Sequence, residues 1–314
     1  MFCYSLKSII CAFAIVLGLG GVAFAIGSDV VLVTGTRTGT YFTFGNNIAE
    51  ISRKTGLTVD ARPSEGSIDN IKTISSYSGA GLGIVQADVL GFLSRSKNPE
   101  SMHIAENLRI VYPFYNEEVH ILARRNIGSF QDLQGKKVAI GEDESGSMLT
   151  AINLFSMMEI KPQEMLKIPA DKGVVRVLKG EIDAIVFVGG KPVRLFRNLE
   201  DLSRPENGEY APLVKDVHFI PLDSPKMLEE YRPATISKLD YKFVDKDIPT
   251  IAVPSVLVSY AGDGRSADAC KKIGQLAKII RDFLPTLKAS SHPKWQEVDL
   301  DRKIGNWKKD DCLL

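Results

Sequence analysis

The chain has 314 residues, which is comfortable for two lobes with a core each, and its 39 Lys and Arg nearly balance its 38 Asp and Glu. The resulting net charge of +1 argues against nucleic acid and against an anionic membrane surface as partners. The four histidines are scattered without the paired spacing of a metal site, and no Cys-x-x-Cys motif is present. We therefore expect no metal and no cofactor.

The first 25 residues have the pattern of a secretory signal peptide. Lys7 is the only charge before Asp29, an apolar run starts at Ile9, and the small-x-small ending Ala23-Phe-Ala25 predicts cleavage after Ala25. The alternative is an uncleaved membrane anchor, for which the apolar run is barely long enough. Cleavage predicts export to a bacterial periplasm, and the loss of Lys7 leaves 38 basic and 38 acidic residues.

The C-terminal part of the chain is expected to return to the first lobe. Cys3 and Cys11 leave with the signal, and the remaining pair, Cys270 and Cys312, predicts a disulfide in an oxidising compartment. That disulfide would tie the tail to the last long helix, predicted over residues 266–287. The two tryptophans beyond this helix, at positions 295 and 307, are expected to bury the tail against the first lobe, which makes that lobe discontinuous.

A strand, a glycine-rich turn and a helix open the mature chain. Residues 30–33 are apolar and mostly β-branched, which predicts a buried strand, and the turn from Gly35 to Gly39 leads into a helix containing Tyr41. Backbone N–H groups at such a turn point toward the space above the helix, where a small anionic ligand could bind; a plain connection is the alternative. No Gly-Lys-Ser/Thr follows Gly39, so the turn is not a P-loop.

Two further turns of this kind follow in the first lobe. A strand over residues 57–62 leads to Ser67, a good helix N-cap with Asn70 three residues later, and a strand over 81–86 ends in Gln86. Strands that alternate with helices predict a parallel, doubly wound sheet whose carboxyl-end turns face one side. The three turns are therefore expected to converge.

The segment over residues 108–123 predicts an interlobe hinge. Pro113 cannot donate to a ladder, so we expect two strands here rather than one, and the Pro-interrupted segment over 216–222 is expected to be the second crossing. A strand over 137–140 then runs into Gly141-Glu-Asp-Glu-Ser145-Gly146-Ser147, which is another turn before a helix. Ser145 as a nucleophile is the alternative, but the order is not Gly-x-Ser-x-Gly and no His is near in sequence, so we favour capture of an anion at the helix N-terminus.

A last strand of the second lobe, over residues 182–188, ends in Gly189-Gly190-Lys191-Pro192. Phe187 would line the carboxyl end of this strand. Lys191 is either an ordinary solvated charge or a contact for an acidic ligand.

Taken together, these stretches resemble the TAXI-type solute receptors (substrate-binding proteins) of TRAP transporters. The matching stretches are Gly35-Thr-Arg-Thr-Gly-Thr-Tyr41 with Gly45, Ser64-Glu-Gly-Ser67-Ile-Asp-Asn70, Gly83-Ile-Val-Gln86-Ala-Asp88, Asp132-Leu-Gln-Gly-Lys136-Lys-Val138, Ser145-Gly-Ser147, and Ile182-Asp-Ala184 through Gly190-Lys-Pro192. The resemblance implies the α/β, two-lobed type II periplasmic-binding-protein fold, with a doubly wound sheet in each lobe and a two-strand hinge. We expect the first lobe over 26–117 and 223–314 and the second over 118–222.

The resemblance also implies a function. It is that of a non-enzymatic periplasmic receptor, which captures a small metabolite, such as glutamate or another carboxylate, and delivers it to a TRAP membrane permease. A ligand-sensing protein of the same fold that docks to a signalling receptor is the alternative. The expected ligand-binding residues are Thr36, Thr38, Gly39, Tyr41, Gly66, Ser67, Asn70, Gln86, Ser145, Gly146, Ser147, Phe187, Gly190 and Lys191. The three acids at 142–144 depart from the small residues common in relatives; they would repel an anion if they faced the cleft, and otherwise point to solvent.

Overall fold

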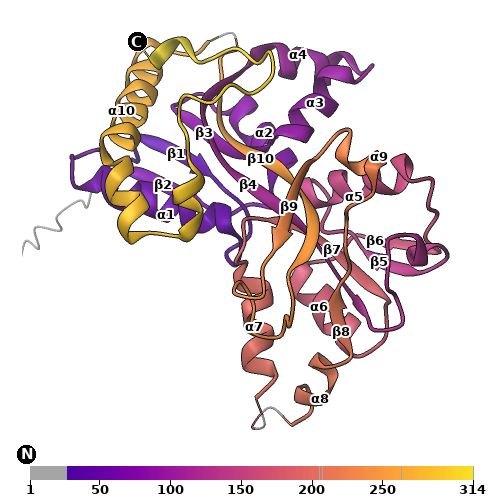
Figure 1. The fold of residues 1–314 in the computed structure, drawn as a ribbon. Helices are drawn as coiled ribbons and strands as arrows, with labels where there is room; N and C mark the ends of the chain where they lie inside the picture. Colours follow the sequence, from indigo (N-terminus) through magenta and orange to yellow (C-terminus); the bar gives the residue numbers. More distant parts are fainter. Residues whose placement is uncertain (1–26, 205, 207, 263, 314) are drawn as a thin grey trace, which may run out of the picture.

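The computed structural model describes residues 27–313 apart from 205, 207 and 263 (Figure 1). The predicted signal peptide, residues 1–25, lies outside the described residues. Across the described part of the chain, no helix has the length and apolar character needed to cross a membrane.

One continuous sheet organises the described residues. Its strands are β1 (Val30–Val33), β2 (Val59–Arg62), β3 (Gly81–Gln86), β4 (Leu108–Arg124), β5 (Lys137–Ala139), β6 (Glu164–Leu166), β7 (Ala184–Gly189), β8 (Val217–Phe219), β9 (Arg232–Ile236) and β10 (Ile248–Tyr260). Their order is β2-β1-β3-β10-β4-β7-β5-β6, with β8 beside β4 and β9 beside β10. β1 is parallel to β2 and β3, and β5 is parallel to β6 and β7, so each end of the sheet is wound as a parallel unit.

The helices cover this sheet in two groups. They are α1 (Thr40–Arg53), α2 (Ser67–Ser76), α3 (Ala87–Arg95), α4 (Pro99–Asn107), α5 (Gly146–Met157), α6 (Ala170–Leu178), α7 (Arg194–Leu202), α8 (Ala211–Val214), α9 (Pro225–Leu228) and α10 (Ala267–Ser290). Helices α1–α4 and α10 belong to the first lobe, and α5–α9 to the second (Figure 1). The α/β, two-lobed architecture predicted from the sequence is confirmed.

Strands β4 and β10 run through both lobes and form the two-strand hinge. The first half of β4 pairs with the second half of β10 in the first lobe, and residues 118–123 of β4 pair with β7 in the second. The prediction of two strands divided at Pro113 is wrong, because β4 is one strand of 17 residues. Pro113 lies next to a register shift between Pro254 and Val256 of β10, where the regular ladder is interrupted and the missing N–H is tolerated.

The sequence suggested that the second crossing lies over residues 216–222, but in the structure the second strand shared by both lobes is β10. Strand β8 pairs with the far end of β4, at residues 122–124, and therefore stays in the second lobe. Leu222, Met227 and Tyr231 pack in one second-lobe core with Ile251 of β10. We therefore propose a lobe boundary near residue 254 in place of the one expected at 223.

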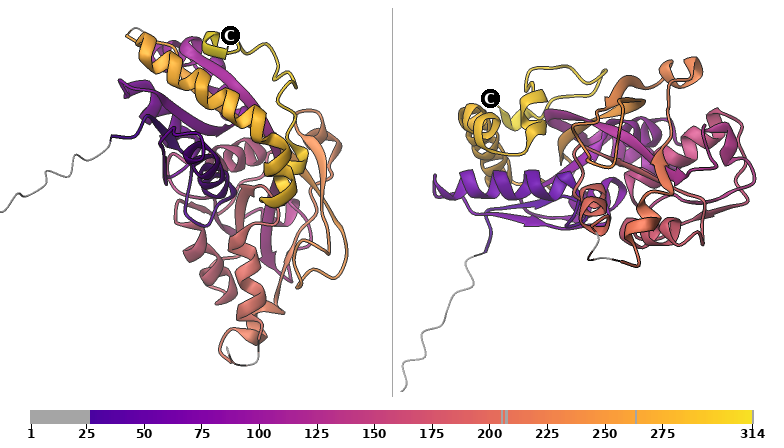
Figure 2. Two further views of the ribbon diagram at one scale, coloured as in Figure 1. Left: turned by 90° about the vertical axis from the view of Figure 1, so that its left-hand side faces the viewer. Right: turned by 60° about the horizontal axis from the view of Figure 1, so that its bottom comes forward.

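The tail of the chain anchors to the first lobe. Trp295 is fully buried and stacks on Phe44 of α1, with ring centroids 4.1 Å apart, and its indole N–H donates to Asn47 Oδ1 at 3.0 Å. Helix α10 lies along the outside of this lobe (Figure 2). A disulfide between Cys270 of α10 and Cys312 ties the end of the chain to this helix, with the two Cα atoms 5.2 Å apart.

Candidate functional site

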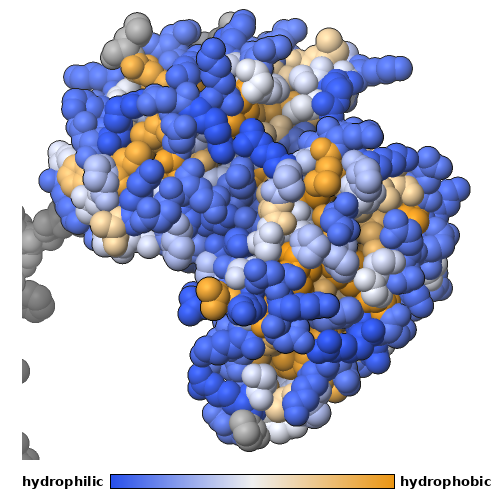
Figure 3. All heavy atoms as spheres, viewed as in Figure 1, coloured by the Kyte–Doolittle hydropathy of each residue, from blue (hydrophilic) through white to orange (hydrophobic). Residues whose placement is uncertain are grey.

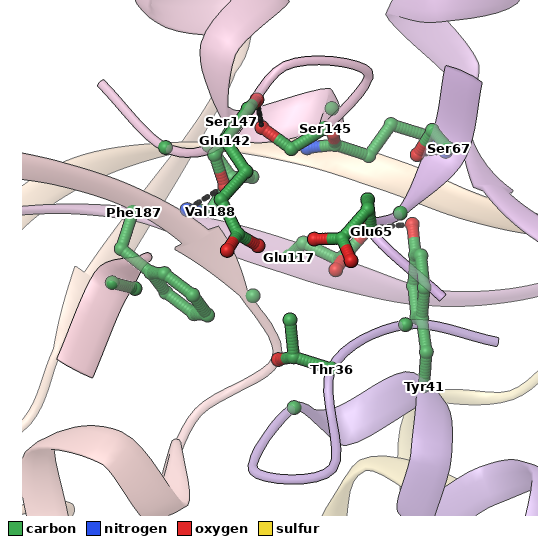
Figure 4. Close-up of a pocket in the computed structure, with 18 of the residues that line it drawn as sticks. Thr36, Tyr41, Glu65, Ser67, Glu117, Glu142, Ser145, Ser147, Phe187 and Val188 are labelled. Carbon is green, nitrogen blue, oxygen red and sulfur yellow. Dashed lines mark hydrogen bonds between the residues drawn. The ribbon is translucent and has the colours of Figure 1, made fainter. Parts of the chain in front are cut away.

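A cavity of about 80 Å³ lies between the lobes, and both lobes supply its walls (Figure 4). Most lining residues belong to turns at the carboxyl ends of β1, β2, β3, β5 and β7, which the parallel winding brings to one side. The lining residues are Gly35, Thr36, Gly39, Thr40, Tyr41, Glu65, Gly66, Ser67, Gln86, Glu117, Gly141, Glu142, Ser145, Gly146, Ser147, Ala170, Phe187, Val188 and Gly189.

The lobes touch one another around this cavity, so the structure shows a closed arrangement. The Thr40 hydroxyl of the first lobe donates to the Gly190 carbonyl of the second at 2.7 Å. The backbone N–H groups of Ile68 and Asp69, at the start of α2, donate to the Glu144 carbonyl at 3.0 and 3.3 Å. On the molecular face shown in Figure 3, polar residues cover much of both lobes.

The floor of the cavity in the first lobe is built around Tyr41 and Glu117. Helix α1 begins after Gly39, which has an extended conformation, and this start places Tyr41 at the cavity. The Tyr41 hydroxyl donates to Glu117 Oε2 at 2.5 Å, and both side chains are buried. Burial raises the pKa of Glu117 well above its ordinary value, which the hydrogen bond from Tyr41 only partly opposes.

Ser67 and Gln86 join the second and third turns of the first lobe. The Ser67 hydroxyl oxygen accepts a hydrogen bond from the Gln86 backbone N–H at 3.0 Å. The Gln86 side chain is 2% exposed, and its Nε2 has no protein hydrogen-bond partner among the described residues. It lies against Gly146 of the opposite lobe, where a Cβ would fall 1.5 Å from Gln86 Oε1.

The N-terminus of α5 forms the second-lobe wall. Ser145 is its N-cap: its hydroxyl accepts from the Met148 N–H at 3.1 Å and donates to the Glu142 carbonyl at 2.8 Å. The Ser147 hydroxyl oxygen accepts from the Val188 N–H at 3.0 Å and so joins α5 to β7. Both serines line the cavity with their hydroxyls already bonded to the backbone.

Three glutamates line the cavity, and no Lys, Arg or His is among its lining residues in the described chain. Burial, a hydrogen bond with Glu65 and the charge of Glu65 together raise the pKa of Glu142 to about 7. The other two acids of this turn point away: Asp143 pairs with Lys167 at 2.6 Å, and Glu144 pairs with Lys72 of the first lobe at 2.5 Å. The lining is therefore acidic.

The structure brings most of the expected ligand-binding residues together but not all of them. Thr38 lines a neighbouring surface groove instead. Asn70 is buried beside the cavity and donates to the Thr34 and Ile84 carbonyls at 2.5 and 2.7 Å, which ties α2 to β1 and β3. Gly190 does not line the cavity, and its carbonyl accepts the hydrogen bond from the Thr40 hydroxyl. Lys191 points away from the cavity, with its Nζ 2.9 Å from Asp240 Oδ2.

The expected ligand-binding residues did not include several lining residues, above all Glu65 and Glu117, and the sequence left the orientation of Glu142 open. The other lining residues that were not expected are Gly35, Thr40, Gly141, Ala170, Val188 and Gly189. A signal for Glu117 was present, because two adjacent acids in a mostly apolar hinge strand are unusual unless they are paired or functional. Its neighbour Glu118 is the paired one, with Oε1 2.6 Å from Lys294 Nζ.

Comparisons with known proteins agree with this architecture. Residues 32–305 match the NMT1-like family. The structure is similar to one described as a periplasmic transporter, with a TM-score of 0.54 and 12% identity, over 89% of this chain and 90% of that one. It is also similar to the periplasmic binding protein BugD, with a TM-score of 0.50 and 12% identity, over 86% of this chain and 85% of that one. The fold is that of the type II periplasmic binding proteins.

Proposed function

Because the chain belongs to the NMT1-like family and has a periplasmic-binding-protein fold, we propose that it is an extracytoplasmic receptor that closes on one small molecule. The observation that carries this proposal is the interlobe cavity, whose walls come from both lobes. A ligand there touches both walls only when the lobes are closed, so its binding favours closure at the β4 and β10 hinge.

The chemistry of the lining favours binding over catalysis. A nucleophilic hydroxyl needs a base within hydrogen-bond reach. The hydroxyl of Ser145 donates to a backbone carbonyl, and that of Ser147 accepts a backbone N–H. The hydroxyl of Tyr41 donates to a carboxyl whose burial favours the neutral form. We therefore propose that the protein is not an enzyme.

The partner we propose is a TRAP-type membrane permease, which would receive the ligand in the periplasm after cleavage of the signal peptide at Ala25. The support is the resemblance of the turn motifs to TAXI-type receptors, which span most of the chain in order. A sensor of the same fold, docking to a signalling receptor, is the second candidate. A permease gene beside this one would favour transport, and a signalling gene in its place would favour sensing.

Small-angle X-ray scattering tests the receptor proposal. Mature protein is stripped of bound small molecules by unfolding and refolding, and its radius of gyration is measured before and after the released low-mass fraction is returned. We expect the radius to decrease on return, because the ligand closes the lobes. A radius that does not change, with the same fraction from an unrelated protein as the control, contradicts the proposal.

A further inference from the structure

From the charge of the cavity, we infer that the ligand of this receptor presents a positively charged nitrogen, as a small amine or ammonium compound does. The inference rests on the proposed function, because it assumes that the interlobe cavity is the ligand site. It departs from the carboxylate that the family resemblance implies.

The acidic side chains come from three separate elements. Glu65 lies in the turn before α2, Glu117 in the hinge strand β4, and Glu142 in the turn before α5. In Figure 4 the labelled carboxyl groups of all three lie around the same space. The site is therefore built from both lobes and from the hinge, and it is not one acidic loop.

Two lysines close to the hinge are engaged elsewhere. The Lys294 ammonium lies 2.6 Å from Glu118 Oε1 and 2.6 Å from Glu297 Oε1. The Lys191 ammonium donates to the Thr235 carbonyl at 2.6 Å and pairs with Asp240. Neither of these lysines lines the cavity. Arg37 lies with Glu65 and Glu142 along a neighbouring groove, and the charge of Lys172 acts on Glu142. Among the described residues that line the cavity itself, however, none is basic, and a ligand can provide a cation there.

Closure buries these carboxyls, and without a cation burial favours their protonated forms, as the raised pKa values of Glu117 and Glu142 indicate. Glu117 is 2% exposed and receives its hydrogen bond from a neutral phenol, and Glu142 of the second lobe meets Glu65 of the first. A buried carboxylate without a cationic partner is costly, and two adjacent carboxylates repel one another. A positively charged ligand stabilises the ionised carboxylates in the closed state only, so its charge favours closure.

The buried amide of Gln86 is an independent sign of a ligand in this cavity. Its Nε2 is an unpartnered donor, and Gln86 is 2% exposed among the lining residues. A ligand with a hydroxyl or carbonyl oxygen would satisfy this donor. The rings of Tyr41 and Phe187 line the same space and suit a cation, which is attracted to aromatic faces.

The volume of the cavity limits the size of the ligand. The cavity is small, at about 80 Å³, which favours a compound of a few heavy atoms over a larger metabolite. A compound of a few heavy atoms with one ammonium and one hydroxyl, such as ethanolamine, has the right chemistry and size to serve as a probe.

The test compares amines with acids of similar size on the mature protein. Thermal unfolding is followed with ethanolamine and propylamine, with glycolate, glutarate and L-glutamate, and with Mg²⁺ and Ca²⁺, all at equal ionic strength. We expect the amines to raise the melting temperature and the acids to leave it unchanged. No effect of either amine, or an equal or larger effect of an acid or a divalent metal, overturns the inference.

Two variants locate the charge. In Glu142→Gln, calorimetry is expected to show ethanolamine binding weakened by about 10-fold to 100-fold, because a hydrogen bond to a charged group is lost. The matched control is Asp143→Asn, whose carboxylate pairs with Lys167 on the surface, and it should bind ethanolamine as the parent does. Glu65→Gln repeats the test from the other lobe. Equal affinity in Glu142→Gln, Glu65→Gln and the control overturns the inference.

The two proposals fail in different ways. If an acid decreases the radius of gyration and the amines do not, the receptor function stands and the assigned charge is wrong. If no probe changes the radius and denaturation releases no small molecule, the receptor function is wrong as well.

Discussion

Replacement of Gly146 by alanine should block closure while leaving each lobe intact. Gly146 is the first residue of α5, and a Cβ there would lie 1.5 Å from Gln86 Oε1 and 2.8 Å from Ser67 Oγ, both in the first lobe. These contacts exist only when the lobes meet. In the open state alanine is a good helix former, so α5 is expected to keep its stability.

The magnitude follows from the cost of overpacking. The Gln86 amide is at the end of a flexible side chain, but it is buried and cannot move freely, so we assign the closed state a cost of about 1–3 kcal/mol. This cost lowers the closing equilibrium, and with it the apparent ligand affinity, by about 5-fold to 150-fold.

The assay is small-angle scattering of Gly146→Ala with the released low-mass fraction, together with thermal unfolding. The control is Gly128→Ala, because a Cβ there meets only Asp132 Oδ2, at 3.8 Å. We expect the control to compact and Gly146→Ala to stay extended at the same ligand level. Equal compaction of the two variants would show that these lobes do not close on Gln86 as described.

Three further predictions concern stability. Trp295→Ala removes a fully buried ring stacked on Phe44 and should cost about 3–5 kcal/mol in urea unfolding; a loss below about 1 kcal/mol would contradict this anchoring. Cys270→Ser opens a disulfide that spans 42 residues, and chain entropy predicts a loss of about 4 kcal/mol in the free energy of unfolding by the same assay. Reduction of the parent protein should cause a similar loss, and an unchanged stability after reduction would contradict this prediction. The pKa of Glu142 is about 7 in the folded protein and ordinarily 4.5, so its stabilising contribution is present below about pH 4.5 and lost as the pH rises through 7. Melting temperatures should therefore fall less steeply over this range in Glu142→Gln, and parallel profiles would refute the assignment.

Local sequence patterns were sufficient for the elements and for the convergence of the turns. The apolar runs that became β1 and β3, and the apolar face of α2, follow from side-chain periodicity. The prediction of Ser67 as the N-cap of α2 is wrong, because Gly66 takes that position and the Ser67 hydroxyl accepts from the Gln86 N–H instead. The hinge was harder to predict. Pro113 suggested a break, but its neighbour strand β10 has a compensating irregularity near Pro254, and the pairing of two strands so far apart in sequence cannot be read from either one.

For the candidate site, residue type alone could not separate ligand contacts from structural ones. Asn70 and Lys191 both had the right chemistry, yet Asn70 bonds to the backbone carbonyls of two strands and Lys191 to Asp240. Conversely, Glu142 was one of three adjacent acids for which two orientations were open. Its position depends on the local turn, with Glu144 at φ 69° and Ser145 capping α5, and on the opposite lobe that contributes Glu65.

Native mass spectrometry of the gently purified mature protein tests the central claim, capture of a small molecule between the lobes, most directly. The account predicts one small-molecule adduct per chain, retained in Gly128→Ala and diminished in Gly146→Ala, since the latter blocks closure. An absence of adduct from the parent protein, or an adduct held equally by both variants, would contradict it.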